Sequence, residues 1–192
     1  KGDPDGVAVL LSVELCSLTF PALQAEIAGF VGGALFGDGA AAVVAVGERR
    51  AEKIRAGGPT VIDSRSHLYP DSQRTMGWDI GATGFKLVLS ADVPDDVTGF
   101  LGDHDLTIDD IGTWVSHPGG PKVIEAIVES LDLSDDALEL TWRSLAEVGN
   151  LSSSSVLHVL HDTIAKTPPA GPGVMMAMGP GFCSELLLLQ WH

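Results

Sequence analysis

The sequence predicts an α/β fold in which helices cover a mixed sheet. Short runs of β-branched and aliphatic residues, such as VAVLLSVEL at 7–15, alternate along the chain with segments whose apolar residues recur at helical spacing. Glycine and proline separate these segments, and the chain has no internal repeat and no run of about eighteen apolar residues. With 192 residues, 45% of them hydrophobic, the chain can form one domain with a sizeable core.

Two buried strands are expected near the start of the chain. The run at 7–15 lies between Gly6 and the polar pair Cys16–Ser17, and its composition suits a sheet covered on both faces. A Gly-rich stretch follows at 29–47, and its last part, 40–46, has the small and β-branched residues of a second buried strand. Glycine in this stretch would let two backbones approach closely.

The middle of the chain predicts shorter elements. Strands are expected at 60–64 and 85–89, and a short helix at 95–101. The residues TWVS at 113–116 predict a strand that leads into the turn HPGGP at 117–121. The proline that closes this turn suits the first position of a helix.

Three helices are expected after that turn. The first starts at the turn, and the second starts at Ser134, whose hydroxyl would cap it ahead of two aspartates, and ends at Gly149. The third runs from about 152 to 166. Their inward faces are predicted to be Val123, Ile124, Ile127, Val128 and Leu131; Leu138, Trp142 and Leu145; and Val156, Leu157, Leu160 and Ile164.

The last segment, VMMAMGPGFCSELLLLQW at 174–191, predicts two strands joined around Gly179–Gly181. The second strand is almost entirely aliphatic. It should therefore lie in the centre of the sheet.

Charge and cysteine content exclude several functions. A net charge of −15 with only 11 Lys and Arg would repel nucleic acid and anionic membranes. Two separated cysteines suggest neither a disulfide framework nor a zinc site, which fits a reducing cytoplasm. The first residues, KGDPDG, are polar turn formers without a targeting segment, so we expect the chain to be part of a longer protein, cut in a surface loop.

Two residues are candidates for chemistry at one end of the sheet. His117 lies in a Gly/Pro turn between a strand and a helix, where α/β sheets place their sites, although a turn histidine without a role is the alternative. Asn150 follows Gly149, where helix capping would also explain an asparagine. The helical hairpin between the two could return both to the same end, where they could donate two hydrogen bonds to an oxyanion.

The other candidates have plain explanations. Neither Cys16 nor Cys183 has a basic neighbour or a helix N-terminus that would make it a good nucleophile. Phe36 and Phe85 border Gly-rich turns, where ordinary core packing is the alternative. A helical pair of histidines, 158 and 161, lacks a third ligand at suitable spacing, which indicates a partly exposed helix face and no metal site.

With these residues, the sequence resembles the type III polyketide synthases, the chalcone/stilbene synthase-like family. The resemblance rests on VELCSLTF, ALFGDGAAAVV, WVSHPGGPK, EVGNLSSSSV and MAMGPGFCSEL and covers nearly all of 1–192. The sequence is similar to bacterial, especially actinobacterial, members that make long-chain alkylpyrones. The family's fold is a thiolase-like αβαβα layered sandwich, and the resemblance implies that 1–192 is its C-terminal domain, without the N-terminal half that carries the nucleophilic Cys.

The resemblance also implies roles for individual residues. The catalytic His and Asn of the family correspond to His117 and Asn150, and its two gatekeeper phenylalanines to Phe36 and Phe85. Further residues match positions that line the pocket or lie near the pantetheine arm and phosphates of coenzyme A: Thr19, Cys16, Ser152, Gly119, Gly120 and Lys122.

The activity that the resemblance implies is decarboxylative Claisen condensation of malonyl-CoA onto a long-chain acyl-CoA starter, with a pyrone-type product. The expected partners are acyl-CoA, malonyl-CoA and the N-terminal half, in a cytoplasmic homodimer that has no bound cofactor. The segment between Phe85 and His117 is shorter than the family's. The alternatives are a ketoacyl-carrier-protein synthase, which has HQAN where this chain has HPGG, and a non-catalytic thiolase-fold assembly protein.

Overall fold

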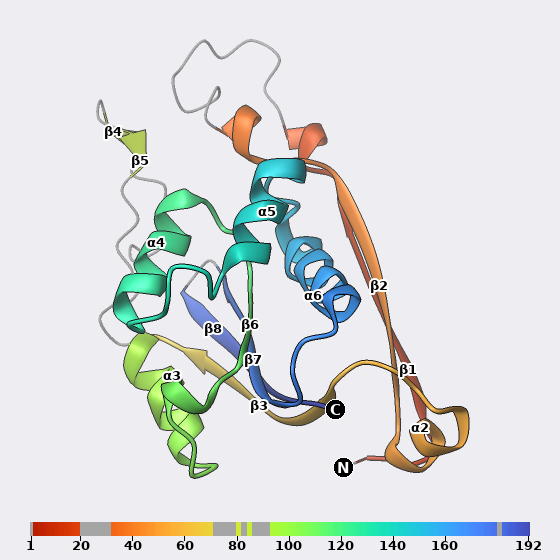
Figure 1. Ribbon diagram of the computed structural model, residues 1–192. Coiled ribbons are helices and arrows are strands. Elements are labelled where there is room, and N and C mark those ends of the chain that lie inside the picture. Colours follow the sequence, from red (N-terminus) through yellow and green to blue (C-terminus); the bar gives the residue numbers. More distant parts are fainter. Residues whose placement is uncertain (1, 20–31, 71–79, 82–83, 86–92, 180–181) are drawn as a thin grey trace.

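The computed structural model describes residues 2–19, 32–70, 80–81, 84–85, 93–179 and 182–192, and it confirms the predicted α/β class (Figure 1). The strands are β1 (Val7–Glu14), β2 (Gly39–Val46), β3 (Thr60–Leu68), β4 (Ile80–Gly81), β5 (Gly84–Phe85), β6 (Thr113–Ser116), β7 (Gly171–Gly179) and β8 (Cys183–Trp191). The helices are α2 (Glu48–Ile54), α3 (Val93–Gly102), α4 (Pro121–Ser130), α5 (Glu139–Val148) and α6 (Ser155–Lys166). Short 3-10 turns occupy Cys16–Thr19, Ile108–Asp110 and Ser152–Ser154.

Within the described residues, the main sheet has four strands in the order β3-β8-β7-β6. The aliphatic strand β8 lies between β3 and β7 and is antiparallel to both, which confirms its predicted central position. The strand that enters the HPGGP turn, β6, is parallel to β7 and forms an edge of the described sheet. The sheet is therefore mixed.

Helices cover both faces of this sheet (Figure 1). Because side chains alternate along a strand, Val174 and Met176 of β7 join the core formed with α3 and α4, whereas Met175 packs in the second core, beneath α6. The helical stripes predicted for 121–131 and 152–166 are confirmed for most of their residues. Ile164, however, is 40% exposed and lies outside the core.

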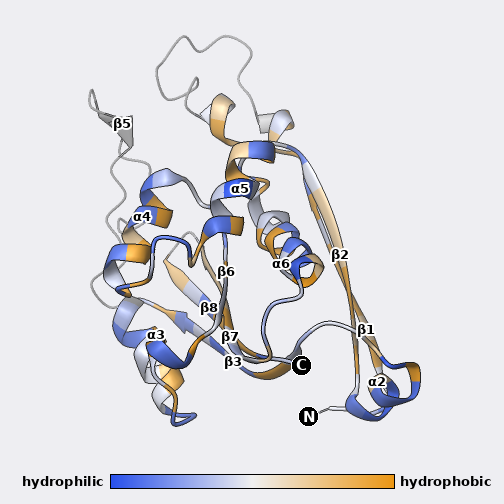
Figure 2. Cartoon of the chain, viewed as in Figure 1, coloured by the Kyte–Doolittle hydropathy of each residue, from blue (hydrophilic) through white to orange (hydrophobic). Residues whose placement is uncertain are grey.

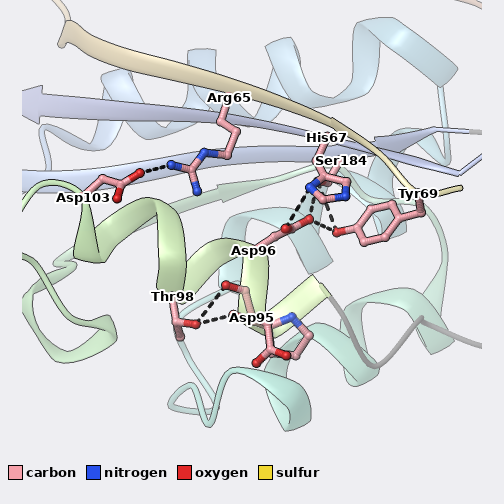
Figure 3. A network of polar contacts seen from close by, with 9 residues as sticks. Arg65, His67, Tyr69, Asp95, Asp96, Thr98, Asp103 and Ser184 are labelled. Atoms are coloured by element: carbon pink, nitrogen blue, oxygen red, sulfur yellow. Dashed lines mark hydrogen bonds and ion pairs between the residues drawn. The ribbon is translucent and has the colours of Figure 1, made fainter.

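A polar network joins α3 to the edge of the sheet (Figure 3). The carboxylate of Asp96 in α3 accepts hydrogen bonds from the hydroxyls of Tyr69 and Ser184, the latter at 3.4 Å, and pairs with His67 Nδ1 at 3.0 Å. Asp103, at the end of the same helix, pairs with Arg65 of β3. These contacts fix α3 against β3 and β8.

The strands β1 and β2 form where they were expected, but the prediction that they are buried is wrong. They pair antiparallel with each other in a separate two-stranded sheet, from Val7 opposite Val46 to Glu14 opposite Gly39. Their apolar side chains are largely exposed, and Leu11 is 71% exposed. Figure 2 shows this apolar ribbon beside α6. An aliphatic composition indicates suitability for burial, whereas burial itself needs elements on both faces.

Three further expectations need correction or fall outside the description. The second predicted helix begins at Glu139 and not at Ser134, because 134–138 form turns in which Ala137 N donates to Ser134 O at 3.0 Å. The strand predicted at 60–64 continues to Leu68 through its pairing with β8. Of the strand predicted at 85–89, only Phe85 is described, as the last residue of β5, and the rest lies outside the described residues. Among the helices that the structure describes, none is long and apolar enough to span a membrane.

Candidate functional site

The HPGGP turn holds His117 at the carboxyl end of β6. The backbone N–H of His117 donates to Met176 O at 3.0 Å and thereby extends the pairing of β6 with β7 by one residue. Its carbonyl accepts from Gly119 N at 2.9 Å, which closes a tight turn. Gly120 has φ 152° and precedes Pro121, the first residue of α4. The strand, the turn and the helix together fix the position of the imidazole.

Burial determines the charge of His117. Removal from water lowers the pKa of its imidazole to about 4. The ring is therefore neutral at neutral pH, with one nitrogen that can donate a hydrogen bond and one that can accept. The expected ion pair with a cysteine thiolate stays a prediction, because the family places that cysteine in its other half.

The side chain of Asn150 reaches the same turn. Its Nδ2 donates to Gly119 O at 3.1 Å, and its Oδ1 accepts from Ser152 N at 2.8 Å. The residue is only 4% exposed. Of the two N–H groups of the amide, one is used in these contacts.

The backbone of Asn150 is held by the Gly-rich segment. Asn150 N donates to Leu35 O at 2.7 Å, and Gly37 N donates to Asn150 O at 3.0 Å. These two bonds make a parallel β-bridge between Phe36 and Asn150. The structure therefore brings together three residues that the sequence singled out separately: His117, Asn150 and Phe36, whose side chain is half-buried.

Glycine is required immediately before Asn150. Gly149 ends α5 with φ 76° and ψ −163°, a combination that is essentially restricted to glycine. A Cβ atom at this position would lie 2.7 Å from Leu35 O, the carbonyl that binds Asn150. The predicted helix end at Gly149 is thus confirmed, and its conformation aims the next residue at the turn.

Neither cysteine gains support as a nucleophile. Burial raises the pKa of the Cys16 thiol, and the nearby carboxylates of Glu14 and Asp38 raise it further. A thiolate is therefore disfavoured at Cys16. Cys183 is partly buried at the start of β8.

Of the remaining predicted residues, some have described side chains and others do not. Lys122 lies on the exposed first turn of α4 and pairs with Glu125 at 2.6 Å. Ser152, in the turn after Asn150, has φ 53°. The side chains of Thr19 and Phe85 lie outside the described residues, so their predicted contact with the pocket stays a prediction.

Sequence reasoning missed Glu14, which ties β1 to the serine-rich turn after Asn150. Its Oε1 accepts hydrogen bonds from Ser153 N at 3.2 Å and from the Ser153 hydroxyl, which lies 2.7 Å from Ser12 Oγ. These bonds lower the pKa of the Glu14 carboxyl. A carboxylate at the end of an otherwise aliphatic strand was the signal that could have indicated this contact.

The helical histidine pair stays unconnected to this site. His158 Nε2 lies 3.2 Å from Ala40 O, and His161 pairs with its neighbour Asp162. Within the described ranges, no three His, Cys, Asp or Glu side chains gather in a group that could hold a metal ion.

Comparison with known proteins places this arrangement in a family. Residues 60–191 match the family described as chalcone and stilbene synthases, C-terminal domain. The chain belongs to the chalcone and stilbene synthases, and this match confirms the predicted resemblance. The matched domain begins at the first residue of β3, so β1, β2 and α2 lie before it.

Individual relatives match almost the whole chain. A 1,3,6,8-tetrahydroxynaphthalene synthase from Streptomyces peucetius subsp. caesius is 54% identical over 200 residues, which cover 99% of this chain and 52% of the relative. The "alpha-pyrone synthesis polyketide synthase-like Pks18" of Mycobacterium tuberculosis (strain ATCC 25618 / H37Rv) is 33% identical over 201 residues, 99% of this chain and 51% of the relative. The chain spans about half the length of the curated relatives it matches.

Solved structures agree with the sequence relatives. The 1,3,6,8-tetrahydroxynaphthalene synthase of Streptomyces coelicolor A3(2), a bacterial type III polyketide synthase, superimposes with a TM-score of 0.80 at 26% identity, over 98% of this chain and 55% of that chain. PKS-I from the brown alga Ectocarpus siliculosus gives a TM-score of 0.78 at 27% identity, over 99% of this chain and 54% of the other. These likenesses confirm the predicted thiolase-like fold.

Proposed function

We propose that this chain supplies the oxyanion-binding half of a type III polyketide synthase that uses malonyl-CoA. The observation that carries the proposal is the contact between Asn150 Nδ2 and Gly119 O, which places the amide at the turn that presents His117. A buried amide and a partly buried imidazole at one end of a sheet suit a reaction in which negative charge develops on a carbonyl oxygen.

In this proposal, the nucleophile comes from the N-terminal half. Its cysteine thiolate attacks the acyl-CoA thioester, forming an acyl-enzyme and releasing coenzyme A. Malonyl-CoA then loses CO₂ to give an enolate, whose carbon attacks the acyl-enzyme carbonyl, and the cysteine leaves as thiolate. His117 and Asn150 donate hydrogen bonds to the enolate and tetrahedral oxyanions. A neutral imidazole can donate in this way, and a nearby thiolate would raise the pKa of His117 and stabilise an imidazolium pair.

Two classes of product are supported for this enzyme. The resemblance to members that make long-chain alkylpyrones supports a long-chain acyl-CoA starter, and the 33% identity to the alpha-pyrone relative supports a pyrone-type product. The 54% identity to a tetrahydroxynaphthalene synthase supports a different product, because a tetrahydroxynaphthalene carries hydroxyl groups and no alkyl chain. The higher identity favours the hydroxylated aromatic product, which needs no alkyl starter.

Product analysis of the full-length enzyme tests both the condensing function and the class of product. The enzyme is incubated with malonyl-CoA alone and with malonyl-CoA plus a long-chain acyl-CoA, and the products are identified by mass spectrometry. A hydroxylated aromatic product from malonyl-CoA alone supports the favoured class, and an alkylpyrone formed only with the starter supports the other. Absence of any polyketide in both reactions would refute the condensing function.

The proposal also includes the partners of this chain. The N-terminal half completes the site, coenzyme A thioesters act as substrates and leave no bound cofactor, and the enzyme works as a homodimer in the cytoplasm. The match to about half the length of the relatives supports the need for a second half. Size-exclusion chromatography with light scattering on the full-length enzyme tests the dimer, and a monomeric mass would contradict it.

A further inference from the structure

The two ends of helix α5 are linked to the backbone on either side of His117. In its first turn, Thr141 Oγ1 donates to Ser116 O at 3.2 Å, and Ser116 directly precedes His117. Just beyond its last residue, Asn150 Nδ2 donates to Gly119 O at 3.1 Å, two residues after His117. The two bonded carbonyls thus flank His117 in the chain.

Strand geometry explains why Ser116 needs a partner from a helix. β6 is an edge of the described sheet, and His117 N points toward β7, where it donates to Met176 O. Backbone groups of successive residues in a strand point to opposite sides, so the carbonyl of Ser116 points away from β7. A buried carbonyl without a ladder partner requires another donor. Thr141 provides that donor.

Burial makes this hydrogen bond hard to replace. Thr141 and Ser116 are each 1% exposed, so bulk water does not reach the carbonyl if the hydroxyl is lost. The β-branched side chain of threonine is also stiff about χ1, which holds the hydroxyl in one direction. The last peptide of β6 is consequently held on one side by β7 and on the other by α5.

We infer that Thr141 is a positioning residue that sets the location of His117 relative to Asn150. Both residues are connected to α5, Asn150 through the chain and His117 through Thr141, so a rigid helix spans the distance between the two oxyanion donors. The inference rests on the proposed function. A misplacement of about 1 Å in a catalytic group can lower a rate by roughly a hundredfold, so a hydrogen bond that fixes this peptide matters for turnover.

Three substitutions in the full-length enzyme test the inference. Thr141→Val removes the hydroxyl and keeps the branched shape, whereas Thr141→Ser keeps the hydroxyl. Thr163→Val is the matched control, because Thr163 is also buried, at 3% exposed, and its hydroxyl donates at 2.7 Å to Val159 O within its own helix. The control removes a buried threonine hydroxyl without touching the turn.

The expected result is a split between turnover and binding. Thr141→Val should lower kcat about tenfold and leave KM within about twofold, while Thr141→Ser and Thr163→Val should keep kcat within about twofold. Both valine variants should lower the melting temperature. A normal kcat in Thr141→Val, or an equal loss in Thr163→Val, would overturn the positioning role.

A second readout separates this inference from the proposed function. The ¹⁵N and ¹³C signals of the His117 ring should shift in Thr141→Val and stay in place in Thr163→Val, whether or not the enzyme makes a polyketide. If wild-type enzyme makes none, the proposed function fails and these signals alone decide the role of Thr141; unchanged signals would refute it. If Thr141→Val does not fold, Thr141→Cys, whose thiol is a weak donor, takes its place in both measurements.

Discussion

At the scale of single residues, the site depends on the buried amide of Asn150 and the partly buried imidazole of His117. The amide of Asn150 uses its oxygen and one N–H in hydrogen bonds within the protein. The imidazole of His117 is neutral because it is buried. In the proposed mechanism, the second N–H of the amide and one ring nitrogen of the neutral imidazole each donate a hydrogen bond to the oxyanion.

Removal of either donor should abolish most of the activity. In the full-length enzyme, His117→Ala and Asn150→Ala should each lower kcat for polyketide formation by roughly a hundredfold or more. His158→Ala is the control, because its ring contacts Ala40 O near β2 and not the turn. Steady-state product formation measured by mass spectrometry checks the result, and near-normal turnover in either variant would contradict its assigned role.

The burial of His117 also predicts a dependence of stability on pH. The folded-state pKa of about 4 lies below the unfolded value of 6.5, so the unfolded chain binds the proton first as the pH falls. The contribution is fully present above pH 6.5 and is lost between pH 6.5 and 4, at up to about 1.4 kcal/mol per pH unit. Urea unfolding between pH 7 and 4 should show a steeper loss for wild type than for His117→Gln, and parallel curves would contradict the buried, neutral state.

At the scale of elements, composition predicted well which segments form strands and helices. It predicted poorly which of them are buried. The runs at 7–15 and 40–46 form strands, yet β1 and β2 are exposed, because burial depends on which elements cover a strand. The helix expected from Ser134 starts at Glu139, since the polar residues that suit a cap also suit a turn. The local sequence pattern indicates the type of element, whereas tertiary packing decides how far the element is buried.

In the candidate site, too, local motifs were predictable and contacts between distant segments were not. The motifs HPGG and GN singled out His117 and Asn150, and the helical hairpin between them correctly suggested a return to one end of the sheet. The bridge between Phe36 and Asn150 could not be predicted, because it joins segments more than a hundred residues apart through backbone atoms. Glu14 and Thr141 were missed for a similar reason, as their partners are distant in the chain.

The helix end at Gly149 offers a test at this scale. Gly149→Ala would place a Cβ 2.7 Å from Leu35 O in a strained backbone conformation, so the bond from Asn150 N to Leu35 O should break or lengthen. We expect a loss of about 1–3 kcal/mol in the free energy of unfolding together with a lower kcat. Gly57→Ala is the control, because no atom lies within 4 Å of its added Cβ. Equal effects of the two substitutions on kcat and on urea unfolding would contradict the need for glycine at Gly149.

At the scale of the whole molecule, the distribution of apolar surface indicates where a partner is needed. The main sheet is covered on both faces, whereas the ribbon of β1 and β2 exposes Val9, Leu11 and Val13. Contiguous apolar surface of this kind usually marks an interface. The match to about half the length of the relatives agrees with a missing partner, which we propose to be the N-terminal half.

The last prediction is that this chain has no condensing activity by itself. It holds both proposed oxyanion donors, but burial and two neighbouring carboxylates disfavour a thiolate at Cys16, so the acyl group has no suitable sulfur to occupy. The 192-residue chain, incubated with malonyl-CoA and acyl-CoA, should give no polyketide by mass spectrometry, whereas the full-length enzyme should give product under the same conditions. Cys183→Ser in the full-length enzyme is the control and should keep its turnover. Product from the isolated chain that disappears when Cys16 or Cys183 of that same chain is replaced by Ser would instead identify that cysteine as the nucleophile and remove the need for a second half.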